Sequence, residues 1–159
     1  MDSPINSTWK LWYHSITDNN WTKKSYNKLF DIRDLCDYKL ISDTFKQNHY
    51  QNGMFFLMKN DIFPNWEDPS NRLGGCLSFK VPSNKIIEDW DQLVLRCITE
   101  NILSQENDVI NGISISPKKE FNIVKLWMRN KQSKHTDLMK EVLPCLVEKD
   151  SMIKDNVVS

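Results

Sequence analysis

The strongest periodic signal in the chain is a helical repeat of apolar residues that begins after Ser83. Apolar side chains recur there at three- and four-residue steps, a spacing that places them on one face of a helix. We therefore expect an amphipathic helix that is capped by Ser83 and runs to about Asn101. The positions that follow this spacing are Ile86, Ile87, Trp90, Leu93, Val94, Cys97, Ile98 and Leu103.

Most of the other apolar segments have the length and pattern of β-strands. Trp9 and Trp12 should lie on opposite faces of the first strand, because successive side chains of a strand alternate. Two later strands are separated by a short basic turn, so we expect them to form a hairpin. The expected strands are Thr8–His14, Ser25–Asp31, Gly53–Met58, Cys76–Val81, Asn111–Ser116, Phe121–Met128 and Cys145–Val147.

Two further helices complete the pattern. Ile32–Phe45 has apolar residues on one side, and Thr136–Leu143 reads as a third helix that Pro144 ends. Locally paired strands with interspersed helices predict the α+β class, with helices packed on one face of a curved antiparallel sheet.

Two polar segments between these elements each carry a tryptophan. Ser15–Lys24 contains turn-forming residues before Trp21, and Asp61–Gly75, rich in proline, asparagine and glycine, contains Trp66. A loop is an unusual place for so large a ring. Such a ring either closes over a small apolar cluster or serves as a platform for a ligand.

The composition is that of a soluble globular protein, with 40 % apolar and 26 % charged residues among 159. We expect one domain over residues 1–159, with short flexible ends near 1–5 and 148–159. No apolar run is long enough to span a membrane, and Met1–Lys10 lacks the core of a signal peptide, so a cytosolic location is expected. The complete lack of alanine fits a low-GC genome, such as that of a large DNA virus or a parasite. A viral protein would act in the host cytoplasm.

The net charge and the cysteine pattern restrict the classes of function that this chain can have. The formal net charge is zero, whereas a general electrostatic nucleic-acid binder would be strongly basic. If the chain binds RNA, it should therefore hold a small local feature. No CxxC pair or Cys/His cluster occurs, so we expect no metal site, disulfide framework or cofactor. Buried reduced thiols are expected at Cys36, Cys76, Cys97 and Cys145.

The residues around the two loop tryptophans offer the parts of a site for a cationic purine nucleotide. A guanine methylated at N7 carries a delocalised positive charge, which attracts an indole ring on each face. One carboxylate can accept both N–H groups of the guanine edge, and basic side chains can hold phosphates. The alternative for Glu67 and Lys118 is plain solvation. The candidate residues are Trp21, Trp66, Glu67, Arg72, Lys118, Lys119 and Trp127.

Several segments resemble the translation initiation factor 4E family, which binds the mRNA cap. Residues 66–75 read Trp-Glu-Asp-Pro-Ser-Asn-Arg-Leu-Gly-Gly, similar to the family's cap loop, and residues 59–64 resemble the approach to that loop. Residues 9–13 resemble its first strand, and residues 112–127 its late hairpin. The resemblance extends from about Pro4 to Pro144. It implies a curved antiparallel sheet with about three helices on its convex face and a cap-binding slot on the concave side.

The resemblance also implies a role for each residue that would contact the base. Trp21 and Trp66 would stack on the methylated guanine. Glu67 would accept its N1 and N2 hydrogens, while the backbone N–H of Trp66 would donate to O6. Trp127 would contact the N7 methyl group.

For the cap phosphates, the resemblance implies Lys118, with Lys119 and Arg72 as further basic residues. Lys118 stands where the family has an arginine, so the charge is kept but the bidentate fork is lost. The family's other basic position aligns near Ile123, which cannot bind phosphate.

The family's helical face binds a short helical motif shared by a scaffold initiation factor and by repressors. In this chain Cys36 replaces the family's tryptophan on the first helix, and Asp91 stands where an apolar residue is expected. These differences predict a scaffold or repressor partner with an altered motif. The candidate contact residues are Pro4, Ile5, Ile32, Cys36, Asp91 and Leu95.

The function implied is non-enzymatic binding of the 7-methylguanosine cap in translation initiation. The alternative is a decoy that sequesters caps or partners and modulates translation without ordinary scaffold recruitment. A decapping hydrolase would need a carboxylate cluster for a metal ion or a nucleophile–base pair. The acidic residues are scattered, and His14, His49 and His135 have no evident partners.

Overall fold

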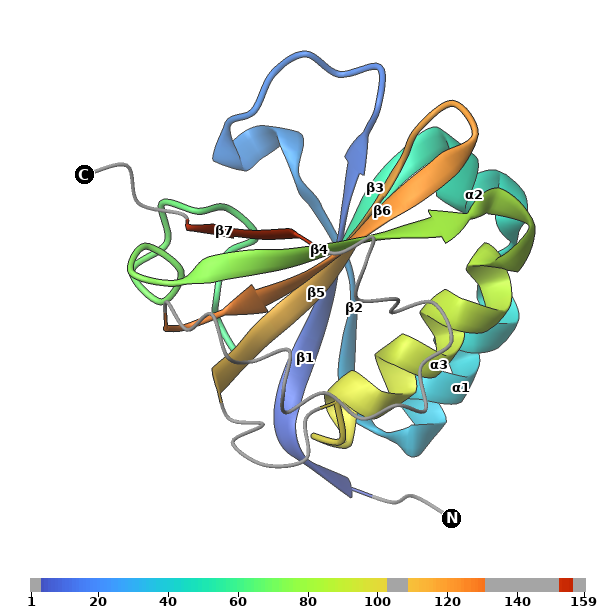
Figure 1. Cartoon of the computed structure of the whole chain (residues 1–159). Helices are drawn as coiled ribbons and strands as arrows, with labels where there is room; N and C mark the ends of the chain where they lie inside the picture. The colour runs from blue at the N-terminus through green and yellow to red at the C-terminus, as the bar shows by residue number, and fades with distance from the viewer. Residues whose placement is uncertain (1–3, 103–108, 131–151, 156–159) are drawn as a thin grey trace.

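Seven strands form one antiparallel sheet in this computed structural model, which describes residues 4–102, 109–130 and 152–155 (Figure 1). The order across the sheet is β2-β1-β3-β5-β6-β4-β7. Neighbouring strands pair antiparallel throughout. The bounds are β1 (Pro4–Ser15), β2 (Asn27–Asp34), β3 (Gly53–Lys59), β4 (Gly75–Pro82), β5 (Ile110–Pro117), β6 (Phe121–Met128) and β7 (Met152–Asp155).

The α-helices lie together on one face of this sheet (Figure 1). They are α1 (Leu35–Thr44), α2 (Gln47–Asn52) and α3 (Ile86–Ile98), and two short 3-10 helices, η1 (Lys23–Ser25) and η2 (Ser83–Lys85), join other elements. Most of the apolar repeat of α3 points inward, as its spacing predicts, but Ile87 is exposed and Leu103 lies outside the described residues. Its buried apolar residues are Ile86, Trp90, Leu93, Val94, Cys97 and Ile98.

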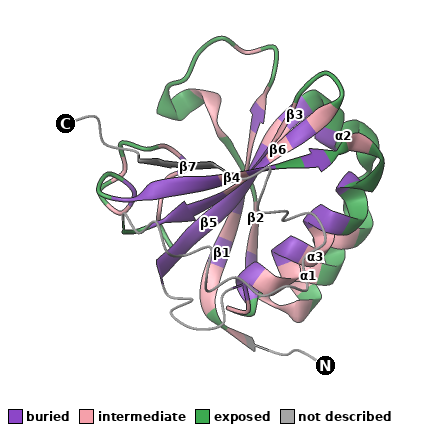
Figure 2. Cartoon of the chain, in the orientation of Figure 1, coloured by how far each residue is buried: buried purple, intermediate pink, exposed green. Residues whose placement is uncertain are grey.

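Strand alternation divides the apolar residues between two clusters on opposite faces of the sheet. In β3, Phe55 and Leu57 belong to the main core under the helices, whereas Phe56 and Met58 belong to a smaller cluster on the other face. Trp9 and Trp12 are separated in the same way, which confirms the prediction from their spacing. Strands such as β5 (Ile110–Pro117) are therefore buried along most of their length (Figure 2).

The α+β class and the curved sheet with helices on one face are confirmed, but two helix boundaries differ from the prediction. Ile32 belongs to β2, not to a helix: it pairs with Trp9 and is fully buried in the main core. Helix α1 begins only after Asp34, whose side chain accepts a hydrogen bond from the Asp37 N–H. Ser83 does not cap α3, because η2 intervenes and places Lys85 at the N-cap position.

Strand pairing also extends further toward the chain ends than expected. Pro4 pairs with Asp34 at the start of β1, and β7 pairs with the first half of β4. Backbone pairing at a sheet edge needs no apolar pattern, so the sequence gives little sign of it. The predicted helix Thr136–Leu143 and strand Cys145–Val147 lie outside the described residues. The short helix α2 was not predicted, since Tyr50 is its one buried residue.

The 60–74 loop is fixed by two buried or half-buried polar residues. Asp68 accepts hydrogen bonds from the backbone N–H groups of Phe63 and Ser70, at 2.8 and 2.9 Å. Asn71 is fully buried and donates to the carbonyl oxygens of Phe63 and Asn65, at 3.1 and 2.8 Å. These bonds replace the water contacts that the loop backbone would otherwise need.

The same loop is tied to the sheet at its far end. The Asn111 amide of β5 donates to the Asn71 Oδ1 atom, at 2.9 Å, and to the Ser70 carbonyl oxygen, at 2.8 Å. Gly74 then passes so close to β6 that a Cβ atom would overlap the Met128 carbonyl oxygen. A glycine is therefore required where the loop re-enters the sheet.

Replacing Asn71 with Asp should loosen this loop. A carboxylate has no N–H to donate, so two buried carbonyl oxygens would face a negatively charged acceptor. We expect a loss of roughly 1–3 kcal/mol in the free energy of unfolding, measured by urea denaturation. The same change at the exposed Asn27 of β2 is the matched control and should cost less than about 0.5 kcal/mol. Equal losses in the two variants would contradict the anchoring role.

Asp89 generates a second, pH-dependent prediction. It lies on the buried side of α3, where burial raises the pKa of its carboxyl group despite the opposing charge of Lys85. A raised pKa means that the folded state prefers the protonated carboxyl group. The contribution of Asp89 to the free energy of unfolding is therefore full in acid and is lost as the pH rises through the raised pKa. Asp89→Asn stays neutral and should stabilise the protein by on the order of 1 kcal/mol at neutral pH. Urea denaturation should show that gain shrinking toward about pH 4; a constant gain would contradict burial of the carboxylate as its cause.

Candidate functional site

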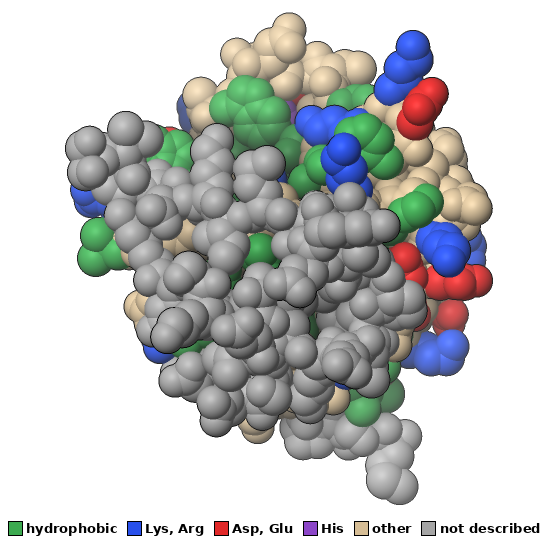
Figure 3. Space-filling model, in the orientation of Figure 1, with side chains coloured by type: hydrophobic (Ala, Val, Ile, Leu, Met, Phe, Trp, Pro, Cys, Tyr) green, Lys and Arg blue, Asp and Glu red, His purple; other side chains and the backbone are tan. Residues whose placement is uncertain are grey.

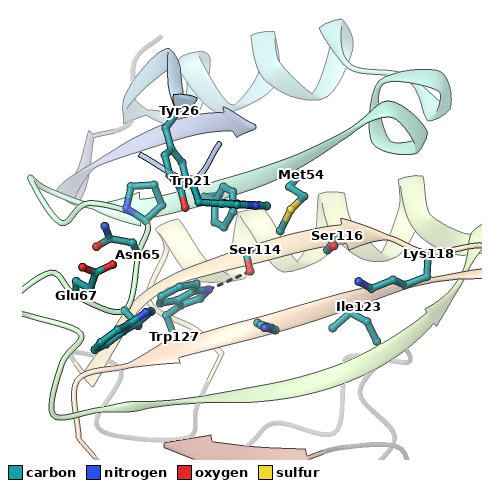
Figure 4. A pocket seen from close by; sticks show the side chains of 14 residues that line it. Trp21, Tyr26, Met54, Asn65, Glu67, Ser114, Ser116, Lys118, Ile123 and Trp127 are labelled. Carbon is teal, nitrogen blue, oxygen red and sulfur yellow. Dashed lines mark hydrogen bonds between the residues drawn. The ribbon is translucent and has the colours of Figure 1, made fainter. Parts of the chain in front are cut away.

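A pocket of about 560 Å³ opens on the face of the sheet opposite the helices (Figure 4). Its floor is made by alternate residues of β3, β5 and β6, whose intervening neighbours face the main core. Its walls come from the segment between β1 and β2 and from the 60–74 loop. The lining residues are Trp21, Tyr26, Met54, Phe56, Pro64, Asn65, Trp66, Glu67, Ser114, Ser116, Lys118, Ile123, Lys125 and Trp127.

The two loop tryptophans both line this pocket. Trp21 is 54 % exposed and Trp66 is 50 % exposed. A ring that closed over an apolar cluster would be mostly buried, so the geometry favours a platform for a ligand over a lid. The ring of Trp21 rests on the buried imidazole of His14, with ring centroids 3.8 Å apart and planes 3° from parallel.

Acidic and aromatic groups meet at one end of the pocket. Glu67 and Asn65 lie together there (Figure 4), and the Glu67 side chain is exposed. The phenol of Tyr26 is close enough to feel that charge: burial first, and then the Glu67 carboxylate, raise the pKa of Tyr26. Tyr26 also packs edge-on against Phe63, at 5.0 Å between centroids, which ties the two walls of the pocket together.

Trp127 forms part of the pocket floor and is only 8 % exposed. Its indole N–H donates to the Ser114 hydroxyl oxygen across the β5–β6 pair, at 3.0 Å (Figure 4). Its ring lies 6.4 Å from that of Phe56, centroid to centroid. The hydrogen bond fixes the plane of the ring, so that the floor is rigid where a ligand would meet it.

The structure places one of the three predicted phosphate residues in the pocket. Lys118 lines it, at the end away from Glu67 (Figure 4), whereas Lys119 and Arg72 are exposed and are not among the lining residues. Lys125 lines the pocket as well, although no motif in the sequence singled it out.

The sequence feature that could have identified Lys125 as a pocket residue is its two-residue spacing from Trp127 on β6. Residues 123, 125 and 127 are two apart and share one face of the strand, so Lys125 had to follow Trp127. Ile123, which aligns near the family's other basic position, also lines the pocket but offers no charge there. On the face drawn in Figure 3, both basic and acidic side chains are visible among the described residues.

The residues predicted to contact a protein partner differ in how far they are exposed. Ile32 is fully buried in the main core and cannot be reached, which corrects that prediction. Cys36 is exposed on α1, contrary to the expectation of a buried thiol, whereas Cys76 and Cys97 are buried. Leu95 is half-buried on α3.

Three other predicted partner contacts have structural roles within the fold. Ile5 packs partly buried against the main core, and Pro4 begins β1. Asp91 of α3 accepts a hydrogen bond from the Tyr38 hydroxyl of α1, at 2.8 Å. Burial and this bond raise the pKa of Tyr38 to about 12. Asp91 therefore links two helices at the position where an apolar contact was expected.

In residues 4–102, 109–130 and 152–155, no three His, Cys, Asp or Glu side chains come together as possible metal ligands. Within the same ranges, none of the helices has the length and apolar character needed to cross a membrane.

Known proteins share both the sequence pattern and the fold. Residues 4–154 match the family model for eukaryotic initiation factor 4E. The eukaryotic translation initiation factor 4E of Candida albicans is 31 % identical over 144 residues, covering 80 % of this chain and 65 % of that protein. The chain thus spans less than two thirds of the length of the curated relatives it matches.

Solved structures add a likeness in fold. The structure of Ascaris suum eIF4E-3 with the m7G cap has a TM-score of 0.82 at 19 % identity, covering 100 % of this chain and 94 % of that one. The complex of C. elegans eIF4E-3 with the 4E-binding protein Mextli gives 0.84 at 18 % identity, with coverage of 98 % and 94 %. Because the family model matches residues 4–154, this chain belongs to the eukaryotic initiation factor 4E family.

Proposed function

We propose that this protein binds the 7-methylguanosine cap at the 5′ end of mRNA and acts in translation initiation without catalysing a reaction. The observation that carries the proposal is the pair of half-exposed tryptophans, Trp21 and Trp66, lining one pocket beside Glu67. Membership of the initiation factor 4E family supports it, as does the cap named for the Ascaris suum relative.

The base would be held by stacking on both faces and by one carboxylate at its edge. Each indole would contribute roughly 0.5–2 kcal/mol of cation–π attraction to a methylated guanine, and less to a neutral one. Glu67 would accept the N1 and N2 hydrogens, and the Trp66 backbone N–H would donate to O6. Trp127, held by Ser114, would contact the N7 methyl group from the floor.

The phosphates would extend from the base toward the opposite end of the pocket. Lys118 and Lys125 both line that path, and each offers a point charge. Lys125 supplies the charge that Ile123 cannot, one step nearer to Trp127 along β6. Lys119 and Arg72, which lie outside the pocket, would act on the phosphates only at longer range.

A second proposed partner is a protein that docks on the helical face. The complex of a relative with a 4E-binding protein supports a scaffold or repressor in this role. Cys36 and Asp91 would require a partner motif that is altered at these positions, since Asp91 is already bonded to Tyr38. Such a factor would work in the cytoplasm, or in the host cytoplasm if the chain is viral.

Fluorescence titration with 7-methyl-GTP and with GTP tests cap binding directly. We expect strong quenching by the methylated nucleotide and little by the other, because only the methylated base is cationic. Glu67→Gln should weaken 7-methyl-GTP binding roughly tenfold to a hundredfold, because it loses the bidentate acceptor. Glu120→Gln, in the exposed turn after β5, is the matched control and should bind like the wild type. Equal quenching by the two nucleotides would rule out the proposed function.

Lys125 provides a separate test of the phosphate path. Lys125→Met should weaken 7-methyl-GTP binding about fivefold and flatten its dependence on salt, since a charge near the phosphates is lost. Lys119→Met removes the same charge outside the pocket and should change the affinity less than twofold, by roughly the value of a screened surface charge. Isothermal titration calorimetry at two salt concentrations measures both. If the two variants lose the same affinity, Lys125 has no special place in the site.

A further inference from the structure

Lys80 of β4 lies beside the pocket, on the same face of the sheet. It pairs with Ile123 of β6, a lining residue at the same end of the pocket as Lys118 (Figure 4). Its neighbours Phe79 and Val81 belong to the main core, so the Lys80 side chain is directed to the opposite, pocket face. Lys80 is exposed and does not line the pocket itself. It therefore stands at the rim of the site.

The ammonium group of Lys80 lies over an aromatic ring. Its Nζ atom is 5.0 Å from the ring centroid of Phe121. Phe121 and Ile123 are two residues apart on β6, so their side chains share the pocket face of that strand. Phe121 is half-buried, which leaves part of its ring accessible. A cation and an aromatic ring thus stand together just beyond the end of the pocket where the phosphates would lie.

Positive charge continues from the pocket to this ring. Lys125 lines the pocket two residues from Ile123 on β6, and the backbone N–H of Lys118 donates to the Phe121 carbonyl oxygen, at 2.8 Å. Within the part of the chain that the structure describes, none of Lys80, Lys118 and Lys125 is ion-paired with a carboxylate. These three ammonium groups are therefore available to an anionic ligand.

An accessible ring beside unpaired lysines suits a single-stranded nucleic acid. In such sites bases stack on aromatic side chains while basic residues follow the phosphates, and every base offers a π-face for stacking. A free cap nucleotide would end at its phosphates, beside Lys118 and Lys125. A ligand that reaches Phe121 must carry a further nucleoside after the triphosphate, as a capped RNA chain does.

We propose that Lys80 and Phe121 form a subsite for the nucleotide that follows the cap, in which the Phe121 ring stacks on the base and the Lys80 ammonium group binds a phosphate of the RNA chain. The inference rests on the proposed cap-binding function. In the free protein the ammonium group covers part of the ring. The lysine stem is flexible, so on binding the ammonium group moves to the phosphate and the base takes its place over the ring.

Two effects oppose binding at this subsite, and both are small. The contact of Lys80 with the ring is given up, but a cation–π contact at an exposed position is weaker than the charge-assisted hydrogen bond to phosphate that replaces it. Glu120 in the adjoining turn repels phosphate. Lys118 and Lys119 belong to the same turn, so two lysines against one glutamate leave it positive.

Two ligands separate the subsite from the pocket. 7-Methyl-GTP ends at its phosphates, whereas the capped dinucleotide m7GpppApG continues into RNA. Lys80→Met should weaken binding of m7GpppApG about fivefold, because one phosphate contact is lost. Binding of 7-methyl-GTP should change less than about twofold. Lys39→Met, on the exposed side of α1, is the matched control and should change neither affinity, both measured by isothermal titration calorimetry.

Phe121 tests the stacking part of the subsite. Phe121→Leu keeps an apolar side chain but removes the ring, and it should weaken m7GpppApG binding about threefold to tenfold while 7-methyl-GTP binding stays within about twofold. Phe121→Trp retains an aromatic face and should bind m7GpppApG at least as tightly as the wild type. Loss of the same affinity in the Leu and Trp variants would overturn stacking as the role of this ring.

Photocrosslinking reports directly where the first nucleotide lies. A capped RNA with 4-thiouridine at that position is bound to the wild-type protein and irradiated, and the crosslinked residue is identified by mass spectrometry. We expect crosslinks at Phe121 or Lys80, and their loss in excess 7-methyl-GTP. Crosslinks that lie only outside β4 and β6 would overturn the subsite.

Failure of the subsite and failure of the proposed function look different. If the wild type binds 7-methyl-GTP, but Lys80→Met and Phe121→Leu weaken both ligands equally or weaken neither, the subsite alone is rejected. If the wild type binds neither ligand, the proposed function is rejected and the subsite with it. Circular dichroism of each variant shows that an affinity loss does not come from unfolding.

Discussion

Keeping two indole rings out of the core is the physical constraint on which the rest of this structure depends. Exposing a large apolar ring sacrifices the burial that normally stabilises a loop, so the backbone that carries it must be fixed by other means. Two fully buried polar residues do this. His14 bonds the segment around Trp21, and Asn71 bonds the loop that carries Trp66. Each satisfies backbone carbonyl groups that would otherwise need water.

The sheet provides the floor of the pocket between the two loops that carry the tryptophans. Alternation along β3, β5 and β6 sends one set of side chains into the main core under the helices and the other set into the floor of the site. Trp127, which donates to Ser114, belongs to this second set. The same strands therefore build both the main core and the floor of the site. The electrostatics of the site follow from this geometry, since Lys125 reaches the pocket only by sharing a strand face with Trp127.

The helical face carries two residues, Cys36 and Asp91, that differ from the pattern implied by the family resemblance. Cys36 is exposed where the family has a tryptophan, and Asp91 joins α3 to Tyr38 of α1. A polar link between two helices is compatible with folding, but it changes the surface that a partner helix would meet. The proposed nucleotide site and the proposed protein-binding face lie on opposite sides of the sheet, so a change in one leaves the other in place.

The sequence by itself determined the elements and the main parts of the site. Alternating and helical periodicity is a local property, so it located six of the strands, helix α3 and the two loops that carry Trp21 and Trp66. The resemblance to the initiation factor 4E family then singled out Glu67, Lys118 and Trp127, and all three line the pocket.

Only the tertiary structure decided which distant residues meet. The burial of Ile32 depends on its pairing with Trp9, and β7 depends on the free edge of β4, neither of which a local pattern reveals. Lys119 and Arg72 carry positive charge but do not line the pocket, whereas Lys125 lines it without a recognisable motif. Direction is set by strand register and long-range packing, and these come from contacts between segments far apart in the chain.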